Sequence, residues 1–251
     1  MRIVINLGFS KLNVCKFMEK SGINQNTPQR MKAMFNFLHD LARNNNREWF
    51  QEHKADYDSF RKVFEFMVQE LIEEISLFDP SVRGVQAKDS IFRIYRDTRF
   101  SHDKTPYKTH FGAWITRGGR KSEYPGYYLH LEPGNTLFAA GIWHPDPKLL
   151  KMVRQEIYDN LDEFLEIIRN PEFENTFGEV QGGSLRILPR GFAKDFPEPH
   201  LLMLKDYFIE YPVKDRFFDE HWVKKAGQVL QKALPFNRFL GNVVDEFSEK
   251  E

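Results

Sequence analysis

The sequence has little cysteine, no excess of charge and no long apolar run, and each absence excludes a class of protein. The one cysteine, Cys15, cannot form an internal disulfide or complete a structural zinc site, so we expect a reducing, cytoplasmic location. No apolar run approaches the roughly 18 residues of a membrane-spanning helix, so we expect no membrane partner. Lys plus Arg and Asp plus Glu both total 36. This balance does not favour a nucleic-acid partner, because dedicated binders carry a basic excess.

What is present indicates a folded domain with an aromatic core. Of the 251 residues, 41% are hydrophobic and 29% are charged, which is ordinary for a globular protein and excludes general disorder. The unusual feature is the number of aromatic residues, with 24 Phe, 9 Tyr and 4 Trp. We therefore expect a large core in which aromatic rings pack against one another. Composition alone does not indicate the oligomeric state.

Residues 1–30 differ in composition from the rest of the chain. Their apolar start is interrupted by Asn6 and lacks a small-residue cleavage site, so we expect no export. They carry five basic residues against the single acid Glu19: Arg2, Lys11, Lys16, Lys20 and Arg30. A basic arm that binds a partner is one interpretation, but the charges are interleaved with Ser and Asn, which favours a peripheral extension. We predict an extension over 1–30 and a single domain over 31–247.

Helical periodicity marks both ends of this domain. Phe35 begins a first helix that ends at residues 44–46, and Asn46 is suited to cap the next helix. A stripe spaced by three or four residues then predicts one long helix, with Phe60 and Phe64 buried. The stripe comprises Trp49, His53, Tyr57, Phe60, Phe64, Met67, Leu71 and Ile75. Asp146–Pro147 begins a further helical region, and Asp219 is suited to cap a last long helix, which a terminal helix follows after Pro235.

The middle of the chain changes to the alternation of β-strands. We predict strands over 91–96 and 110–117, the second containing Gly112, which permits a bulge or a close approach. Two more, 127–132 and 136–143, flank a Pro-Gly-Asn turn and form a hairpin. Residues 207–213 suit an edge strand. The fold class is therefore α+β: an antiparallel meander of about four or more strands, packed with long amphipathic helices from both chain ends.

A long basic loop between the first two predicted strands is the main candidate site. Loops of this length inside a compact domain are more often functional than not, and Phe100, Pro106 and Tyr107 offer anchors against disorder. Residues 93–110 hold five basic side chains and two acids, and five minus two leaves three positive charges. These are Arg93, Arg96, Arg99, Lys104 and Lys108 against Asp97 and Asp103.

Guanidinium groups beside loop hydroxyls suit a phosphate or a carboxylate, because arginine offers a planar fork of donors. Strand alternation would place Arg93 on the same face as Asp97, which would orient it. Tyr95 or Tyr107 would stack on an organic part of the ligand, as in a nucleotide. The predicted ligand-binding residues are Arg93, Arg96, Asp97, Arg99, Asp103, Lys104, Tyr107 and Lys108.

Three alternatives for this loop stay open. Its charges can brace the loop against the acidic face of the long helix, since structural ion-pair networks imitate sites. The loop can belong to a phosphoester-processing enzyme, with His102 or Asp103 as general base. It can also belong to a protein-interaction module whose basic loop contacts an acidic partner. The leading hypothesis is the anion-binding domain.

Several motifs resemble an uncharacterised, largely bacterial family catalogued as a domain of unknown function (2461). The most specific is the central motif, residues 92–101 followed by 103–109, which contains FRIYRDTRFS and DKTPYKT. The others are Phe37–Leu38, residues 44–50 with His53–Lys54, residues 127–131, residues 141–143 with Pro145, and residues 188–192. The similarity covers roughly Met31 to Phe239. It implies one α+β domain and no activity, cofactor or catalytic residue.

Other candidate sites are weaker. His130 and His144 lie on or beside the hairpin, but two histidines without an acid or a third ligand make a poor zinc site. His53 lies on the aromatic stripe, where a packed histidine is the better interpretation. The sequence contains no dinucleotide fingerprint, phosphate-binding loop, HExxH or paired CxxC motif. We therefore predict no metal and no cofactor.

Overall fold

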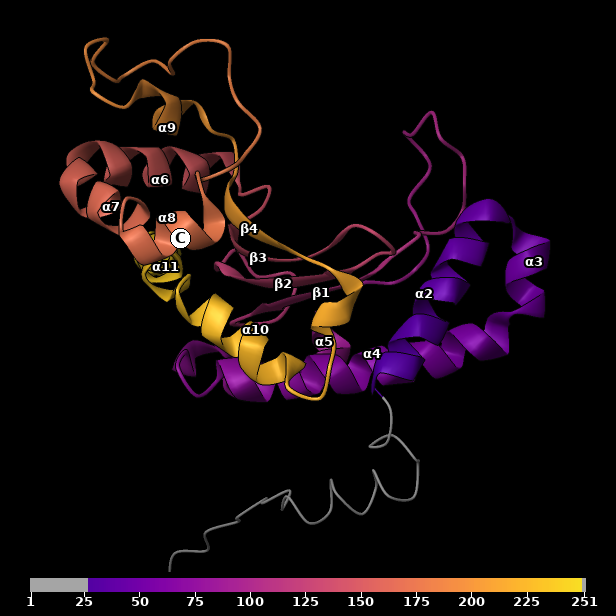
Figure 1. Cartoon of the computed structure of the whole chain (residues 1–251). Coiled ribbons are helices and arrows are strands. Elements are labelled where there is room, and N and C mark those ends of the chain that lie inside the picture. Colours follow the sequence, from indigo (N-terminus) through magenta and orange to yellow (C-terminus); the bar gives the residue numbers. More distant parts are fainter. Residues whose placement is uncertain (1–26, 250–251) are drawn as a thin grey trace, which may run out of the picture.

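The computed structural model describes residues 27–249, so most of the predicted extension lies outside the described residues. Its centre is a four-stranded antiparallel sheet in the order β1-β2-β3-β4 (Figure 1). The strands are β1 Phe111–Thr116, β2 Gly126–Leu131, β3 Thr136–Ile142 and β4 Tyr207–Val213. The predicted hairpin is confirmed, with Asn135 N–H donating to the Glu132 carbonyl across the turn. The α+β meander is confirmed as well.

The predicted strand over residues 91–96 is wrong. This segment makes only isolated bridges, from Ile91 to Ala113 and from Tyr95 to Tyr107. Its first part lies beside β1, and its second part turns to bond its own loop, where Arg96 N–H donates to the Pro106 carbonyl. The segment changes partner after two residues, so no continuous ladder forms and the predicted alternation of faces is absent. The fourth strand of the sheet is instead β4, the predicted edge strand.

Helices precede the sheet, join β3 to β4, and follow β4. They are α2 Thr27–Arg43, α3 Arg47–Glu52, α4 Lys54–Ile75, α5 Ala87–Ser90, α6 Pro147–Asp159, α7 Leu161–Ile168, α8 Pro171–Phe177, α9 Pro199–Met203, α10 Trp222–Gln231 and α11 Leu234–Glu249, with short 3-10 helices η1 Pro80–Val82 and η2 Asp215–Phe217. Asn46 caps α3, as predicted, by accepting from Trp49 N–H. None of these helices within residues 27–249 is both long and apolar enough to cross a membrane.

The predicted long helix is interrupted at His53. Its ring Nδ1 lies 2.8 Å from the Trp49 carbonyl oxygen, and its ring stacks on the Trp49 indole. His53 is therefore a packed histidine, as the sequence indicates, and it joins α3 to α4. Along α4 the stripe is buried at Phe64 and only partly buried at Phe60. The spacing of three or four residues thus predicts which face of α4 packs on the core, but not how deeply each residue is buried.

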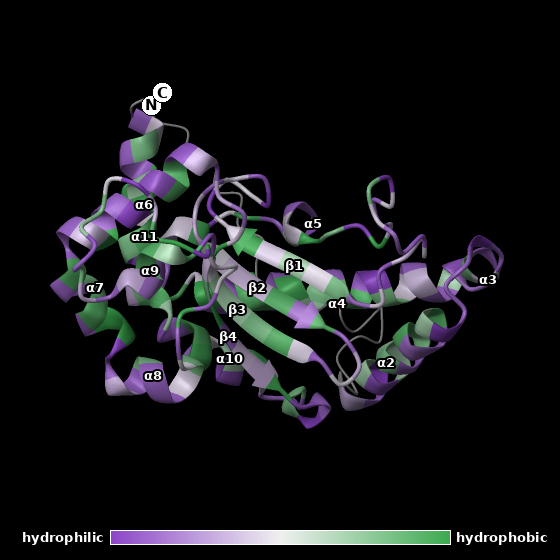
Figure 2. Cartoon of the chain, turned by 90° about the horizontal axis from the view of Figure 1, so that it is seen from above, coloured by the Kyte–Doolittle hydropathy of each residue, from purple (hydrophilic) through white to green (hydrophobic). Residues whose placement is uncertain are grey.

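Strand alternation gives the sheet two different faces. One face packs on α4 and α10, which run beneath the strands in Figure 1. Its side chains are buried: Phe111, Ala113, Ile115, Tyr127, Leu129, Leu131, Phe138, Ala140, Ile142, Tyr207 and Ile209. We call this the covered face. Seen from above, β1 to β4 present their opposite face to the viewer (Figure 2), and we call it the open face.

Candidate functional site

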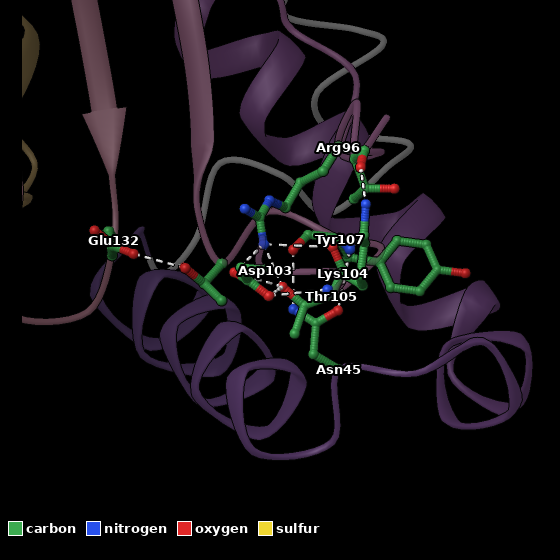
Figure 3. Close-up of polar contacts among 9 residues, drawn as sticks. Asn45, Arg96, Asp103, Lys104, Thr105, Tyr107 and Glu132 are labelled. Carbon is green, nitrogen blue, oxygen red and sulfur yellow. Dashed lines mark hydrogen bonds and ion pairs between the residues drawn. The ribbon is translucent and has the colours of Figure 1, made fainter. Parts of the chain in front are cut away.

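The basic loop rises above the sheet and is held by its own charges. The Arg96 guanidinium bonds both the Asp103 carboxylate and the Thr105 hydroxyl, and Figure 3 shows it pointing toward them. Arg99 binds Asp97 through two nitrogens, at 3.0 and 2.6 Å. The predicted pairing of Asp97 with Arg93 is therefore replaced by a pairing with Arg99. The strand alternation that joined Asp97 to Arg93 does not exist, because residues 91–96 form no strand.

The other loop contacts also lie within the loop or anchor it to the core. Lys104 donates to the Thr98 carbonyl at 2.9 Å. Tyr107 is buried, stacks on Phe50 with ring centroids 4.0 Å apart, and exchanges two backbone hydrogen bonds with the Asn45 side chain. Tyr107 thus fixes the base of the loop. This leaves Tyr95 as the exposed ring of the two predicted to stack on a ligand.

Both loop carboxylates are strongly acidic. Hydrogen bonds from the Arg99 side chain and backbone lower the pKa of Asp97 to about 2. The Thr105 backbone and the Arg96 guanidinium lower the pKa of Asp103 to about 2 as well. A general base works best with a pKa near the operating pH. Asp103 is therefore a weak general base at neutral pH.

A pocket of about 660 Å³ lies on the open face, beside this loop. Aromatic rings form much of its wall, and cations stand among them. Its lining includes Phe92, Lys108, Trp114, Arg120, Lys121, Tyr124, Tyr128, His130, Trp143, Phe208 and Glu210. The volume falls in the range of small-molecule sites, roughly 300–1,000 Å³, and such sites combine apolar walls with a few placed polar groups. Of the predicted site residues, Lys108 lines this pocket.

Lys108 is a half-buried cation of the pocket lining. Its ammonium nitrogen lies 5.1 Å from the centre of the Phe92 ring. Within residues 27–249 it forms no ion pair with a carboxylate, and the same holds for Arg93. Burial, and then the nearby Arg93 charge, lower the pKa of Lys108. Arg120, in contrast, is held by backbone carbonyls, including those of Asp89 and Ile91.

A second polar cluster, which the sequence did not predict, lies at one end of the open face. His110, His130 and Glu132 bring one ligand atom each within 4.8 Å of one another. The His110 and His130 rings are 4.2 Å apart, and His130 Nε2 lies 3.2 Å from the Glu132 carboxylate. Burial, and then the nearby His130, lower the pKa of His110 to about 4, so its imidazole is neutral at neutral pH.

From the sequence, His130 and His144 are considered together as a possible zinc site. In the structure His130 has different neighbours, His110 and Glu132. His144 is exposed beyond the end of β3, and its backbone N–H donates to Asp206. Two facts signal the observed cluster: Glu132 directly follows β2, two residues after His130, and His110 directly precedes β1. The register of the two strands was needed to combine these facts.

The comparisons with known proteins identify one family. The family described as "Conserved hypothetical protein (DUF2461)" matches residues 33–239. The chain belongs to this family. No curated protein and no solved structure matches it. The family description names no activity or ligand.

Proposed function

We propose that this domain binds a small anionic molecule with a planar ring, such as a nucleotide, in the pocket on the open face. Lys108 and Arg93 hold the phosphate or carboxylate, and the aromatic wall holds the ring. The observation that carries the proposal is Lys108 itself. It is a half-buried cation on an aromatic wall, and no carboxylate in the described part of the chain pairs with it.

Keeping Lys108 and Arg93 near each other has an energetic cost in the empty protein. Burial already disfavours the charged ammonium, and the neighbouring guanidinium disfavours it further. A bound anion reverses both effects, because it supplies the missing opposite charge. Groups held at such a disadvantage are typical of binding sites, where function opposes stability.

The aromatic wall suits a planar ring. Trp114 and Tyr128 lie opposite each other on β1 and β2, and Phe208 extends the wall from β4. Stacking of a base on such a ring is worth about 1–3 kcal/mol and tolerates different bases. The pocket has a size suited to one small molecule. The zero formal charge of the chain does not favour a nucleic acid as the partner. A reducing cytoplasm, which the single cysteine favours, is part of the proposal.

The remaining loop cations have a supporting role in this proposal. Arg96 and Arg99 already bind Asp103 and Asp97, and Lys104 binds a backbone carbonyl. They stiffen the loop whose two ends carry Arg93 and Lys108. In this proposal Lys108 lines the pocket, Arg93 lies near Lys108, and the other predicted ligand-binding residues shape the loop.

Titration with nucleoside 5′-monophosphates tests the proposal. Trp114 and Trp143 line the pocket, so binding should change the tryptophan fluorescence in a saturable way. The free nucleoside should bind more weakly than the nucleotide. Added salt should lower the affinity for the nucleotide, because the anion contact is partly exposed. Arg93→Gln should lower the affinity about tenfold, the loss of one charge-assisted contact.

Arg99→Gln is the matched control. It removes an equal charge six positions after Arg93, and the Arg99 side chain is already bound to Asp97. It should leave the affinity for the nucleotide unchanged. Equal binding of nucleoside and nucleotide would contradict the proposed anion contact. Equal losses for both arginine variants would favour a general effect of charge over a built site.

A further inference from the structure

We propose that His110, His130 and Glu132 bind a divalent transition-metal ion, with zinc as the best-suited member of that class. The site lies at the end of the pocket, since His130 also lines it. The inference goes beyond the proposed nucleotide binding and does not depend on it. Two imidazoles and one carboxylate are a ligand set used by zinc sites that keep a position open for water or substrate.

The sheet builds this cluster through its register. Phe111 pairs with Leu131 and Gly112 with His130, so the register extended by one residue places His110 opposite Glu132. His130 and Glu132 lie two residues apart and therefore point to the same face. Bonds of about 2.0–2.2 Å to zinc require ligand atoms within ~4 Å of one another. The observed limit of 4.8 Å needs only a small rotation of the side chains.

The neighbours of the cluster resemble the outer shell of a metal site. The Tyr128 hydroxyl lies 3.0 Å from His130 Nδ1, and Thr109 donates to Glu132 at 2.7 Å. Asn135 donates to the other Glu132 oxygen at 2.9 Å. Metal-binding histidines and carboxylates are usually fixed by hydrogen bonds of this kind. Gly112 provides the room, because a Cβ there would lie 2.6 Å from the Tyr128 hydroxyl oxygen.

Tyr128 can support His130 with or without a metal. Without metal, a proton on Nε2 can bond Glu132 while Nδ1 accepts from the Tyr128 hydroxyl. With metal, the proton lies on Nδ1 and is donated to the Tyr128 oxygen, which frees the Nε2 lone pair for the ion. The change is one of tautomer, so His130 exchanges one proton with solvent and keeps its neutral charge.

His110 is the residue that decides between a metal site and a purely structural network. A Tyr128–His130–Glu132 chain of hydrogen bonds would be complete without it. His110 is partly buried, and none of the residues 27–249 forms a hydrogen bond with its ring. A nitrogen of this ring is therefore available to a metal ion that His130 and Glu132 also bind.

Direct metal binding tests the inference, with Co²⁺ and Zn²⁺ as probes and no nucleotide present. Untagged protein carrying Cys15→Ser excludes the single thiol as a ligand. We expect one equivalent of Zn²⁺ after dialysis, measured by mass spectrometry, and a visible Co²⁺ spectrum typical of a site with fewer than six ligands. His110→Ala and His130→Ala should each weaken binding more than 100-fold, beyond the 10–100-fold range of outer-shell changes.

Tyr128→Phe should weaken binding about tenfold, as an outer-shell change. His102→Ala is the control, because it removes an exposed loop histidine outside the cluster. Circular dichroism checks that each variant is folded. If an alanine variant unfolds, His110→Gln replaces it, and this folded variant should also lose binding.

Wild-type protein without stoichiometric Zn²⁺ or Co²⁺ would overturn the inference, as would full binding by folded His110→Ala or His110→Gln. This failure is distinguishable from failure of the proposed function. Nucleotide binding is measured without metal, and Arg93→Gln should still bind Co²⁺ with wild-type affinity.

Discussion

The covered and open faces of the sheet come from the same four strands, but core packing accounts for the choice of residues on the covered face only. On the covered face, helices α4 and α10 close over the strands, and packing accounts for nearly every side chain. On the open face, aromatic and ionisable side chains alternate with that core and line a pocket. Packing does not require a histidine or a lysine there. The same alternation therefore encodes stability on one face and a candidate site on the other.

The largest expected effect tests the covered face. Phe64 is fully buried on α4 and packs against Phe111 of β1, with ring centroids 5.3 Å apart. Phe64→Ala should cost about 3–5 kcal/mol in the free energy of unfolding, through lost transfer energy and a cavity. Trp114→Ala, on the open face, should cost less despite the larger ring. Denaturant titration of both variants measures this difference, and the reverse order would contradict the distinction between the faces.

A smaller effect compares two adjacent tyrosines on opposite faces of β2. The Tyr127 hydroxyl is buried and donates to Asp79 at 2.8 Å. Tyr127→Phe removes this donor from Asp79 Oδ2, while Ser81 still donates to Oδ1, and should cost about 1–3 kcal/mol. Tyr128→Phe should cost less than about 1 kcal/mol in the metal-free protein, because its partner His130 is only partly buried. Thermal unfolding of the two variants provides the test, and equal costs would mean that Tyr128 is a core residue.

The smallest effect concerns a charged residue on the packed side. Burial, and then the neighbouring Glu73, raise the pKa of Glu70 on α4 to about 7. A carboxyl group with a raised folded pKa contributes stability below its ordinary pKa and loses that contribution as pH rises to 7. Glu70→Gln should therefore be more stable than wild type at pH 8, by less than about 1 kcal/mol because solvent screens the partly exposed group.

The same comparison at pH 4 should show no advantage for Glu70→Gln, because the wild-type carboxyl is then protonated. Melting temperatures at the two pH values measure the change. A variant that is equally stabilised at both values would contradict the link to titration.

Most of the fold was predictable because local signals and the final structure agree. The Pro-Gly-Asn turn predicted the β2–β3 hairpin, and Asn46 predicted the start of α3. Residues 91–96 show where local signals end. Their alternation is typical of a strand, but a strand also needs a continuous partner, and here the partner changes from β1 to the loop itself. Only the three-dimensional path of the chain determines that change.

The candidate site was predictable only where local sequence signals sufficed. Lys108 and Arg93 were predicted because the loop is unusually long and basic. The pairing of Arg99 with Asp97 depended on local geometry that a strand prediction misrepresents. His110 and Glu132 are 22 positions apart, and only the register of β1 with β2 brings them together. The binding roles of the loop residues stay predictions.

The most direct test of anion binding on the open face replaces Lys108, the half-buried cation that lines the pocket. Lys108→Gln should leave the free energy of unfolding of the empty protein unchanged or slightly higher, because a half-buried charge near Arg93 is removed. It should also lower the affinity for a nucleoside 5′-monophosphate about tenfold. Lys104→Gln, the matched control on the same loop, should leave that affinity unchanged. A loss of stability above ~2 kcal/mol in Lys108→Gln, or an unaltered affinity, would contradict the claim that the open face is the binding face.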